Sequence, residues 1–362
     1  MKFKTTFILA LLLPLGITAQ NKSYQLETTY FYGSILPHQK NILHLIQANP
    51  EGALLSFNKK TFGEKPWHSW YNYPDYGLSF QYQNNKNDIL GNLYGLYAHM
   101  NFYFFKRNLQ LRVGQGIAYN TNPYDVNYNF KNVAYGAAIM PSTYFMLNYH
   151  KENVYKNIGF NAGINFVHHS NANLKAPNTS TNTLALSVGL NYNLGKEKAF
   201  IPDTLSNPDI DKALKYSVFF RTGVCESDVP NSGAKPFYVA TAMVDKKLNK
   251  KSKVQFGAEV FWMQYLKEFI KYDAIVFYEN NNDPEADYKR IGVFLGHELL
   301  IGNLGIDTQF GYYVYDPSKK QGSVYQRLGA RYYFTDNVSG GVSLKTHMAQ
   351  AEAMEFTIGY TF

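Results

Sequence analysis

The chain has 362 residues, a formal net charge of +8, and charged residues at only 17%, below the roughly 25% of an average soluble domain. It contains 31 tyrosines, 26 phenylalanines and a single cysteine, Cys225, which excludes an internal disulfide. No run of Lys or Arg is long enough to predict nucleic-acid binding, so the positive charge suits anionic lipid headgroups better. Few charges and many aromatic residues favour a sheet with one apolar and one polar face, as in a membrane barrel.

The N-terminus predicts export. Two lysines precede an apolar run from Phe7 to Leu15, and the sequence then reaches the small residue Ala19. This pattern is typical of a secretory signal peptide, although a buried N-terminal helix is the alternative. No later segment approaches the roughly 20 apolar residues that a membrane-spanning helix needs. We therefore expect residues 1–19 to be a signal peptide for Sec-type export.

About sixteen strand-like segments follow, and many of them alternate apolar and polar residues as the strands of a membrane barrel do. They lie near 23–36, 51–58, 75–84, 91–105, 109–120, 133–149, 155–170, 182–194, 216–227, 236–248, 253–266, 289–302, 304–315, 324–334, 338–349 and 353–362. We predict an all-β fold in which residues 20–362 form one transmembrane antiparallel β-barrel of about 16 strands, with 12 or 14 as alternatives. Such a barrel would leave space inside. A soluble β-sandwich or jelly roll would show similar short strands.

The arginines of these strands fall on the polar faces. Arg112 alternates with apolar residues of its strand, and Arg327 and Arg331 do the same in theirs. An arginine facing lipid at mid-bilayer costs roughly 2–4 kcal/mol, so we expect all three to line the lumen. If the chain starts in the periplasm, short turns fall on the inner side and longer loops outside, except for the long inner connections 59–74 and 195–215.

The last strand is apolar on one face and ends in Phe362. It resembles the assembly signal of bacterial outer-membrane barrels. The resemblance implies a location in the outer membrane of a Gram-negative bacterium and the barrel-assembly machinery as a partner.

The hairpin at 155–195 carries the candidate active site. An apolar face runs through alternate residues and then continues to His168 and Ser170. On the next strand, the apolar face leads back by one step to Asn182. Polar groups on such a face are costly unless they are paired or used. We therefore expect these three side chains to form one site on the apolar side of the hairpin.

The residue types indicate nucleophilic catalysis. His168 and Ser170 are two apart, so on a strand they share a face, and His168 can take the proton of the Ser170 hydroxyl. No carboxylate is near in sequence, and Asn182 is the candidate to orient the imidazole, as an asparagine does in Cys-His-Asn sites. Backbone N–H groups after Ser170, with Asn171 or Asn178, are the candidates to hold the oxyanion.

This segment resembles the lipid A 3-O-deacylase family of outer-membrane barrels, often described as acyloxyacyl-hydrolase-like. The residues that match the family motif in order are His168, Ser170, Asn171, Lys175, Pro177 and Asn178. The resemblance implies an esterase in which Ser170 attacks an ester-linked acyl chain of lipid A (lipopolysaccharide) and His168 is the base. Two features depart from the family: Asn182 stands at the position of its glutamate, and the chain is about twice as long as the small deacylase barrels.

Two other functions are left open. Asn182 follows Ser170 by twelve residues, a spacing that looks like outer-membrane phospholipase A, a family with a Ser-His-Asn triad and often calcium. That resemblance implies a phospholipid substrate. The absence of a carboxylate also leaves a barrel without catalysis, acting as a channel or binding protein. We expect no cofactor and no metal site, apart from calcium in a phospholipase. His297, in an apolar row, is interpreted as an interface histidine.

Overall fold

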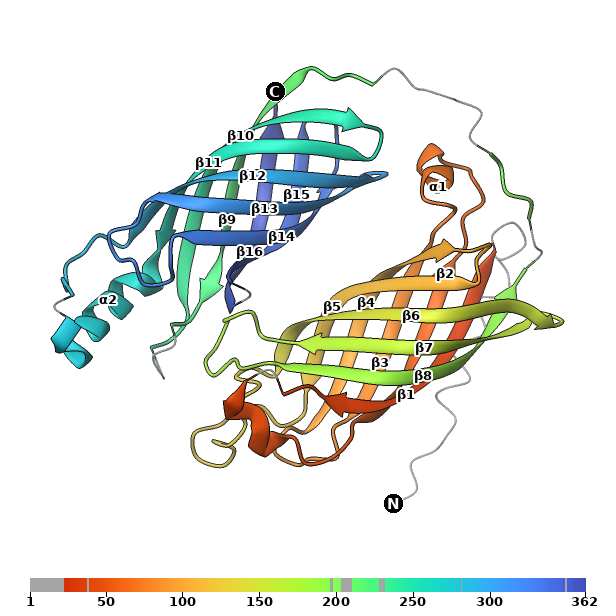
Figure 1. The fold of residues 1–362 in the computed structure, drawn as a ribbon, viewed down its shortest axis with the longest axis horizontal. Coiled ribbons are helices and arrows are strands. Elements are labelled where there is room, and N and C mark those ends of the chain that lie inside the picture. The colour runs from red at the N-terminus through yellow and green to blue at the C-terminus, as the bar shows by residue number, and fades with distance from the viewer. Residues whose placement is uncertain are drawn as a thin grey trace. The chain divides into compact units, whose positions relative to one another are not determined.

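The computed structural model describes residues 23–37, 39–195, 198–202, 210–227, 232–280, 282–348 and 350–362. The predicted signal peptide lies outside the described residues. The described chain is dominated by β-strands (Figure 1), which confirms the all-β prediction. None of its helices has the length and apolar character needed to cross a membrane.

The strands form two closed antiparallel barrels of eight strands each (Figure 1). The N-terminal barrel consists of β1 (Tyr24–Ile35), β2 (Glu51–Lys59), β3 (Asp75–Asn84), β4 (Asn92–Phe104), β5 (Leu109–Asn120), β6 (Ile139–Tyr155), β7 (Ile158–His169) and β8 (Thr181–Leu194). The C-terminal barrel consists of β9 (Leu214–Cys225), β10 (Lys235–Asn249), β11 (Ser252–Met263), β12 (Lys289–Ile301), β13 (Leu304–Tyr315), β14 (Val324–Tyr333), β15 (Val338–His347) and β16 (Gln350–Thr361). The helical segments are η3 (Lys40–Leu45), α1 (Pro66–Trp70), α2 (Gln264–Val276) and η4 (Tyr278–Asn280).

The prediction of one barrel of about 16 strands across 20–362, with 12 or 14 as alternatives, is therefore wrong. β8 does not pair with β9. It returns to β1, where Tyr24 faces Leu194, and β16 closes on β9, where Phe356 faces Thr222. Alternation identifies the two faces of a strand, but it does not identify the strand that closes a sheet. The long connection that was predicted to be an inner turn of one barrel instead joins two barrels.

The alternation itself is confirmed. On β8 the apolar residues Leu184, Leu186 and Val188 are exposed, whereas Ala185 and Ser187 between them are buried. The predicted inward arginines, at positions 112, 327 and 331, are also buried inside their barrels. The sequence boundaries agree with the structure to within a few residues for most strands. The largest difference is β6, which was predicted at 133–149 and lies at Ile139–Tyr155.

Polar side chains fill the N-terminal barrel. The guanidinium of Arg112 donates to Glu27 Oε2 at 2.9 Å, to Ser56 Oγ at 2.9 Å and to Asn101 Oδ1 at 2.6 Å. All four residues are almost fully buried. A buried ion pair of this kind is tolerated because the remaining donors also have partners.

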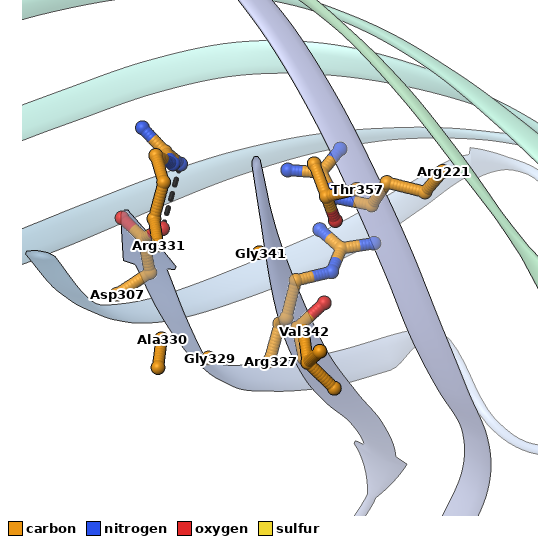
Figure 2. Close-up of a pocket in the computed structure, with 10 residues that line it drawn as sticks. Arg221, Asp307, Arg327, Gly329, Ala330, Arg331, Gly341, Val342 and Thr357 are labelled. Carbon is orange, nitrogen blue, oxygen red and sulfur yellow. Dashed lines mark ion pairs between the residues drawn. The ribbon is translucent and has the colours of Figure 1, made fainter. Parts of the chain in front are cut away.

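The C-terminal barrel is filled in the same way. Arg327 donates to Glu259 at 2.8 Å and to Glu355 at 2.6 Å, and Arg221 donates to Glu259 at 3.0 Å. Figure 2 shows part of this interior, a small pocket beside these arginines where Arg331 pairs with Asp307 at 2.6 Å. The predicted open lumen is wrong, because an eight-stranded barrel is just wide enough for its own side chains.

Candidate active site

The β7–β8 hairpin places the two predicted partners of the site directly opposite each other. His168 pairs with Asn182 in the register of the two strands, and both side chains lie on the outer face. His168 Nδ1 is 2.6 Å from Asn182 Oδ1. Because an amide oxygen can only accept, this bond places the imidazole proton on Nδ1 and the lone pair of the neutral ring on Nε2. His168 is therefore set up to accept a proton at Nε2.

Ser170 follows the end of β7. Its N–H donates to the carbonyl of Pro141 at 3.4 Å, which continues the β6–β7 pairing by one residue beyond His169. In that extended backbone Ser170 falls on the same side of the strand as His168, two residues away. The structure thus brings the serine, the histidine and the asparagine of the sequence prediction to one edge of the N-terminal barrel.

The loop after Ser170 is closed by its own asparagines. The backbone N–H of Asn171 donates to Asn178 Oδ1 at 2.9 Å, and the side-chain amide of Asn171 donates to the carbonyl of Lys175 at 2.5 Å. Ala172 and Asn173 have φ of 53° and 64°, so the chain turns through the left-handed region directly after Asn171. Asn171 and Asn178 therefore hold the loop together, and their contact with an oxyanion remains a prediction.

The inner side of the same strand is held by residues that sequence reasoning missed. Ser142 on β6 donates its hydroxyl to the carbonyl of His168 at 3.1 Å. Its oxygen also lies 2.9 Å from His169 Nδ1 and 2.8 Å from the hydroxyl of Tyr97. These groups are buried inside the barrel, directly behind the His168 backbone. No local pattern marks them, because only the pairing of β4, β6 and β7 brings them together.

A second missed feature is a polar row on the outer face. Gln115 on β5 pairs with Thr143 on β6, and Thr143 pairs with His168 on β7. The Thr143 hydroxyl lies 2.5 Å from Gln115 Oε1, and Gln115 Nε2 donates to the carbonyl of Ser142 at 3.2 Å. A signal was present in the sequence, since Gln115 interrupts an apolar outward row between Val113 and Ile117.

Two other candidates stay outside this site. His297 lies exposed on β12, with Nε2 at 2.5 Å from the hydroxyl of Ser252. Among the described residues, no three His, Cys, Asp or Glu side chains are grouped so that they could hold a metal ion.

Comparison with known protein families identifies the class of this protein. The family description "Lipid A 3-O-deacylase (PagL)" matches residues 51–191, and "Acyloxyacyl hydrolase, C-terminal domain" matches residues 214–362. The two matches fall on the two barrels, with the gap between them at the connection from β8 to β9. The chain belongs to the lipid A 3-O-deacylase family of acyloxyacyl hydrolases, which confirms the resemblance stated from the motif.

Other comparisons add little. The solved structures that match include mutants of Rhodopseudomonas blastica porin, one of them at 10% identity, covering 94% of this chain and 100% of the porin at a TM-score of 0.19. A triple mutant of the same porin matches at 8% identity, with the same coverage and TM-score. Scores this low carry no argument about fold or function. A search of curated proteins gave no match.

Proposed function

We propose that this protein is an outer-membrane serine esterase that removes an ester-linked acyl chain from lipid A at the outer leaflet. The observation that carries the proposal is the bond from His168 Nδ1 to Asn182 Oδ1, on the outer wall and beside Ser170. The matches to the lipid A 3-O-deacylase and acyloxyacyl hydrolase descriptions support the substrate class. The exposed apolar face of the barrel supports a membrane location, because closed barrels can bury such a face in lipid.

The site supports a two-step acyl transfer. Ser170 Oγ attacks the ester carbonyl while His168 Nε2 takes the hydroxyl proton. When the tetrahedral intermediate collapses, the same proton passes to the leaving oxygen and an acyl-enzyme remains. Water, activated by His168, then releases the fatty acid. Asn182 holds the imidazole in the tautomer that these reaction steps need. Its amide stabilises the imidazolium less than a carboxylate would.

The loop after Ser170 supplies the rest of the site. Asn171 and Asn178 keep the backbone that follows the nucleophile in one conformation. N–H groups of this turn, with the amides of Asn171 and Asn178, are the donors we assign to the oxyanion. A lipid reaches the site by lateral diffusion along the outer wall, after export and insertion by the barrel-assembly machinery.

The test removes the hydroxyl oxygen of Ser170. Cells that express the wild-type chain are expected to release an acyl chain from lipid A, detected by mass spectrometry, and Ser170→Ala is expected to abolish the release. A fluorophosphonate probe should label the wild type and not the variant, while electrophoresis with and without heating shows both barrels folded. Release of the acyl chain by Ser170→Ala at the wild-type rate would overturn the assignment.

Phospholipid hydrolysis is the second candidate, and the amide partner of His168 favours it, because outer-membrane phospholipase A resembles this site in using an asparagine. The same mass spectra separate the two functions, since loss of acyl chains from phospholipids, with dependence on added calcium, would support a phospholipase. A channel is the weakest candidate, because buried side chains fill the interiors of both described barrels.

A further inference from the structure

Lysines gather at one short turn of the C-terminal barrel. Five of the eight residues 246–253, which contain the turn from β10 to β11, are lysines, and none is acidic. The turns from β12 to β13 and from β14 to β15 lie at the same end of the barrel, and they hold Gly302-Asn303 and residues 334–337, without a lysine. The positive charge at this end is therefore concentrated at β10 and β11.

The lysines of this turn do not all serve the same purpose. Lys253 belongs to the interior of the barrel, where its Nζ lies 3.3 Å from Glu298 and donates to the hydroxyl of Tyr333 at 2.9 Å. Lys246 is exposed on the outer wall, and Lys250 and Lys251 form the turn itself. The charge outside the barrel therefore comes from the turn and from the wall next to it.

A row of paired residues leads along the outer wall from Lys246 to a histidine. Lys246 is opposite Val254 in the β10–β11 register, and Val254 is opposite His297 in the β11–β12 register. All three side chains are exposed, whereas their chain neighbours Asp245 and Glu298 are buried. Paired residues on adjacent strands lie roughly 5 Å apart, so the backbones of Lys246 and His297 are about 10 Å apart, with Val254 between them.

The pair of Ser252 and His297 supplies a hydrogen-bond donor beside this row. His297 Nε2 is 2.5 Å from Ser252 Oγ. If the serine donates to Nε2, the neutral ring carries its proton on Nδ1, and that N–H is the remaining donor. If Nε2 donates to the serine, the serine O–H is the remaining donor. Either arrangement leaves one donor next to lysine charge, and its complement is an anionic oxygen such as that of a phosphate.

The row lies near the end of the barrel. Ser252 is the first residue of β11, Lys246 is three residues before the end of β10, and His297 is four residues before the end of β12. At about 3.3 Å per residue, all three lie within roughly 13 Å of the strand ends, and the tilt of barrel strands makes their depth smaller. In the membrane location proposed above, long lysine side chains from here reach the headgroups.

We propose that Lys246, Ser252 and His297, together with the turn lysines Lys250 and Lys251, bind the phosphate of an anionic glycerophospholipid. Clusters of four or more basic residues beside membrane-spanning segments bind anionic headgroups. The short turns face the periplasm in the orientation predicted from the sequence, so the lipid belongs to the periplasmic leaflet. The site uses the membrane location proposed above and does not depend on the esterase activity.

The experiment measures lipid binding to the full chain in detergent micelles by native mass spectrometry. The Ser170→Ala background is used so that no lipid is hydrolysed. The probes are phosphatidylglycerol, phosphatidylethanolamine and diacylglycerol with the same acyl chains. Phosphatidylglycerol is expected to occupy one tight site, phosphatidylethanolamine to bind more weakly because its ammonium offsets its phosphate, and diacylglycerol to bind least. Equal binding of phosphatidylglycerol and diacylglycerol would overturn the proposal.

Substitutions in the row should weaken the binding of phosphatidylglycerol. Lys246→Gln is expected to weaken it about fivefold, the effect of one lysine near an anionic headgroup. His297→Leu should also weaken it, and His297→Gln, which keeps a hydrogen-bond donor, should restore most of the affinity. Lys250→Gln with Lys251→Gln should weaken it further. Diacylglycerol binding should stay at the wild-type level in every variant, which shows that the barrel is intact.

Lys289→Gln is the matched control. Lys289 is exposed on the same face of β12 as His297, but it begins the strand at the opposite end. The variant removes the same charge as Lys246→Gln and should leave the binding of phosphatidylglycerol unchanged. Equal weakening by the two variants would mean that net charge attracts the lipid, and would overturn the site.

Inorganic phosphate distinguishes a lipid ligand from a free anion. A large excess should displace little phosphatidylglycerol, because the acyl chains also pack on the apolar wall. Complete displacement would mean that the ligand is the free anion, and the lipid assignment would fail. Acyl release from lipid A is not part of any of these readouts, so this site and the proposed esterase succeed or fail separately.

Discussion

His168 and Asn182 face each other across β7 and β8, with Nδ1 and Oδ1 2.6 Å apart on the outer wall of the N-terminal barrel. The bond selects one tautomer of the histidine and fixes the ring plane. An exposed histidine without this partner would sample other rotamers.

Replacing Asn182 tests that relationship. Asn182→Leu should lower kcat by about 10²-fold with little change in KM, because the partner orients a general base and does not bind the lipid. Asn182→Glu should keep or raise kcat, because a carboxylate accepts the same bond and stabilises the imidazolium that forms. Kinetics on lipid A in micelles measure both. A fully active Asn182→Leu enzyme would contradict the orienting role.

The loop after the nucleophile makes a separate prediction. Asn178→Asp keeps an acceptor oxygen for the N–H of Asn171, whereas Asn178→Leu removes it. We expect Asn178→Leu to lower kcat by roughly tenfold, because the loss of this one hydrogen bond lets the loop after Ser170 move. Asn178→Asp should retain more of the activity. The rate of fluorophosphonate labelling at Ser170 should fall from wild type to Asn178→Asp to Asn178→Leu. Faster labelling of Asn178→Leu than of Asn178→Asp would show that the amide nitrogen of Asn178 matters instead.

The interior of the C-terminal barrel should respond strongly to one carboxylate. Glu259 accepts bonds from Arg221, Arg327 and Tyr325, and all of them are buried. Glu259→Gln removes one of the two buried carboxylates that balance Arg221 and Arg327, the other being Glu355, which should lower the free energy of unfolding by about 3–5 kcal/mol. Urea titration in detergent measures this loss.

Glu51→Gln is the matched control for that experiment. Glu51 pairs with Lys86 at 2.9 Å on the surface of the N-terminal barrel. Surface pairs contribute little to stability, so this variant should unfold at the wild-type urea concentration. Equal shifts in the two variants would mean that the interior network has no special role.

Closure of each sheet predicts independent folding. The β9–β16 barrel has no unpaired edge among its described strands, so residues 210–362 expressed alone with a signal peptide should give a heat-modifiable band. The piece should not react with the fluorophosphonate, because the predicted catalytic residues all lie in β7, β8 and the loop between them. Aggregation of the isolated piece in every detergent tested would contradict the prediction.

The sequence predicted most of the local structure. Strand faces followed from the alternation of apolar and polar residues, a property of each strand by itself. The His168–Asn182 pair also followed, because a hairpin places its two strands side by side and their apolar faces on one side. Ser170 was placed by the same continuation of the face past His169.

The number of barrels could not be predicted in this way. Pairing of Tyr24 with Leu194 is a contact between residues far apart in the chain, and no pattern within β8 distinguishes β1 from β9 as its partner. The opposite charges of inward residues such as Arg112 and Glu27 could have indicated small, filled barrels. In a wide, open lumen these charges would not need to pair with each other. Thr143 and Ser142 were missed because their relation to His168 depends on the β6–β7 register.

Because β8 pairs with β1, residues 24–194 contain every strand of the N-terminal barrel, and no strand from β9 to β16 is needed to close it. Two strands of the chain close a barrel. β8 pairs with β1 and lies inside the chain, and β16 pairs with β9. In the membrane location proposed above, the N-terminal barrel closes at β8, an internal strand, so its insertion must be completed without a chain end to mark the last strand.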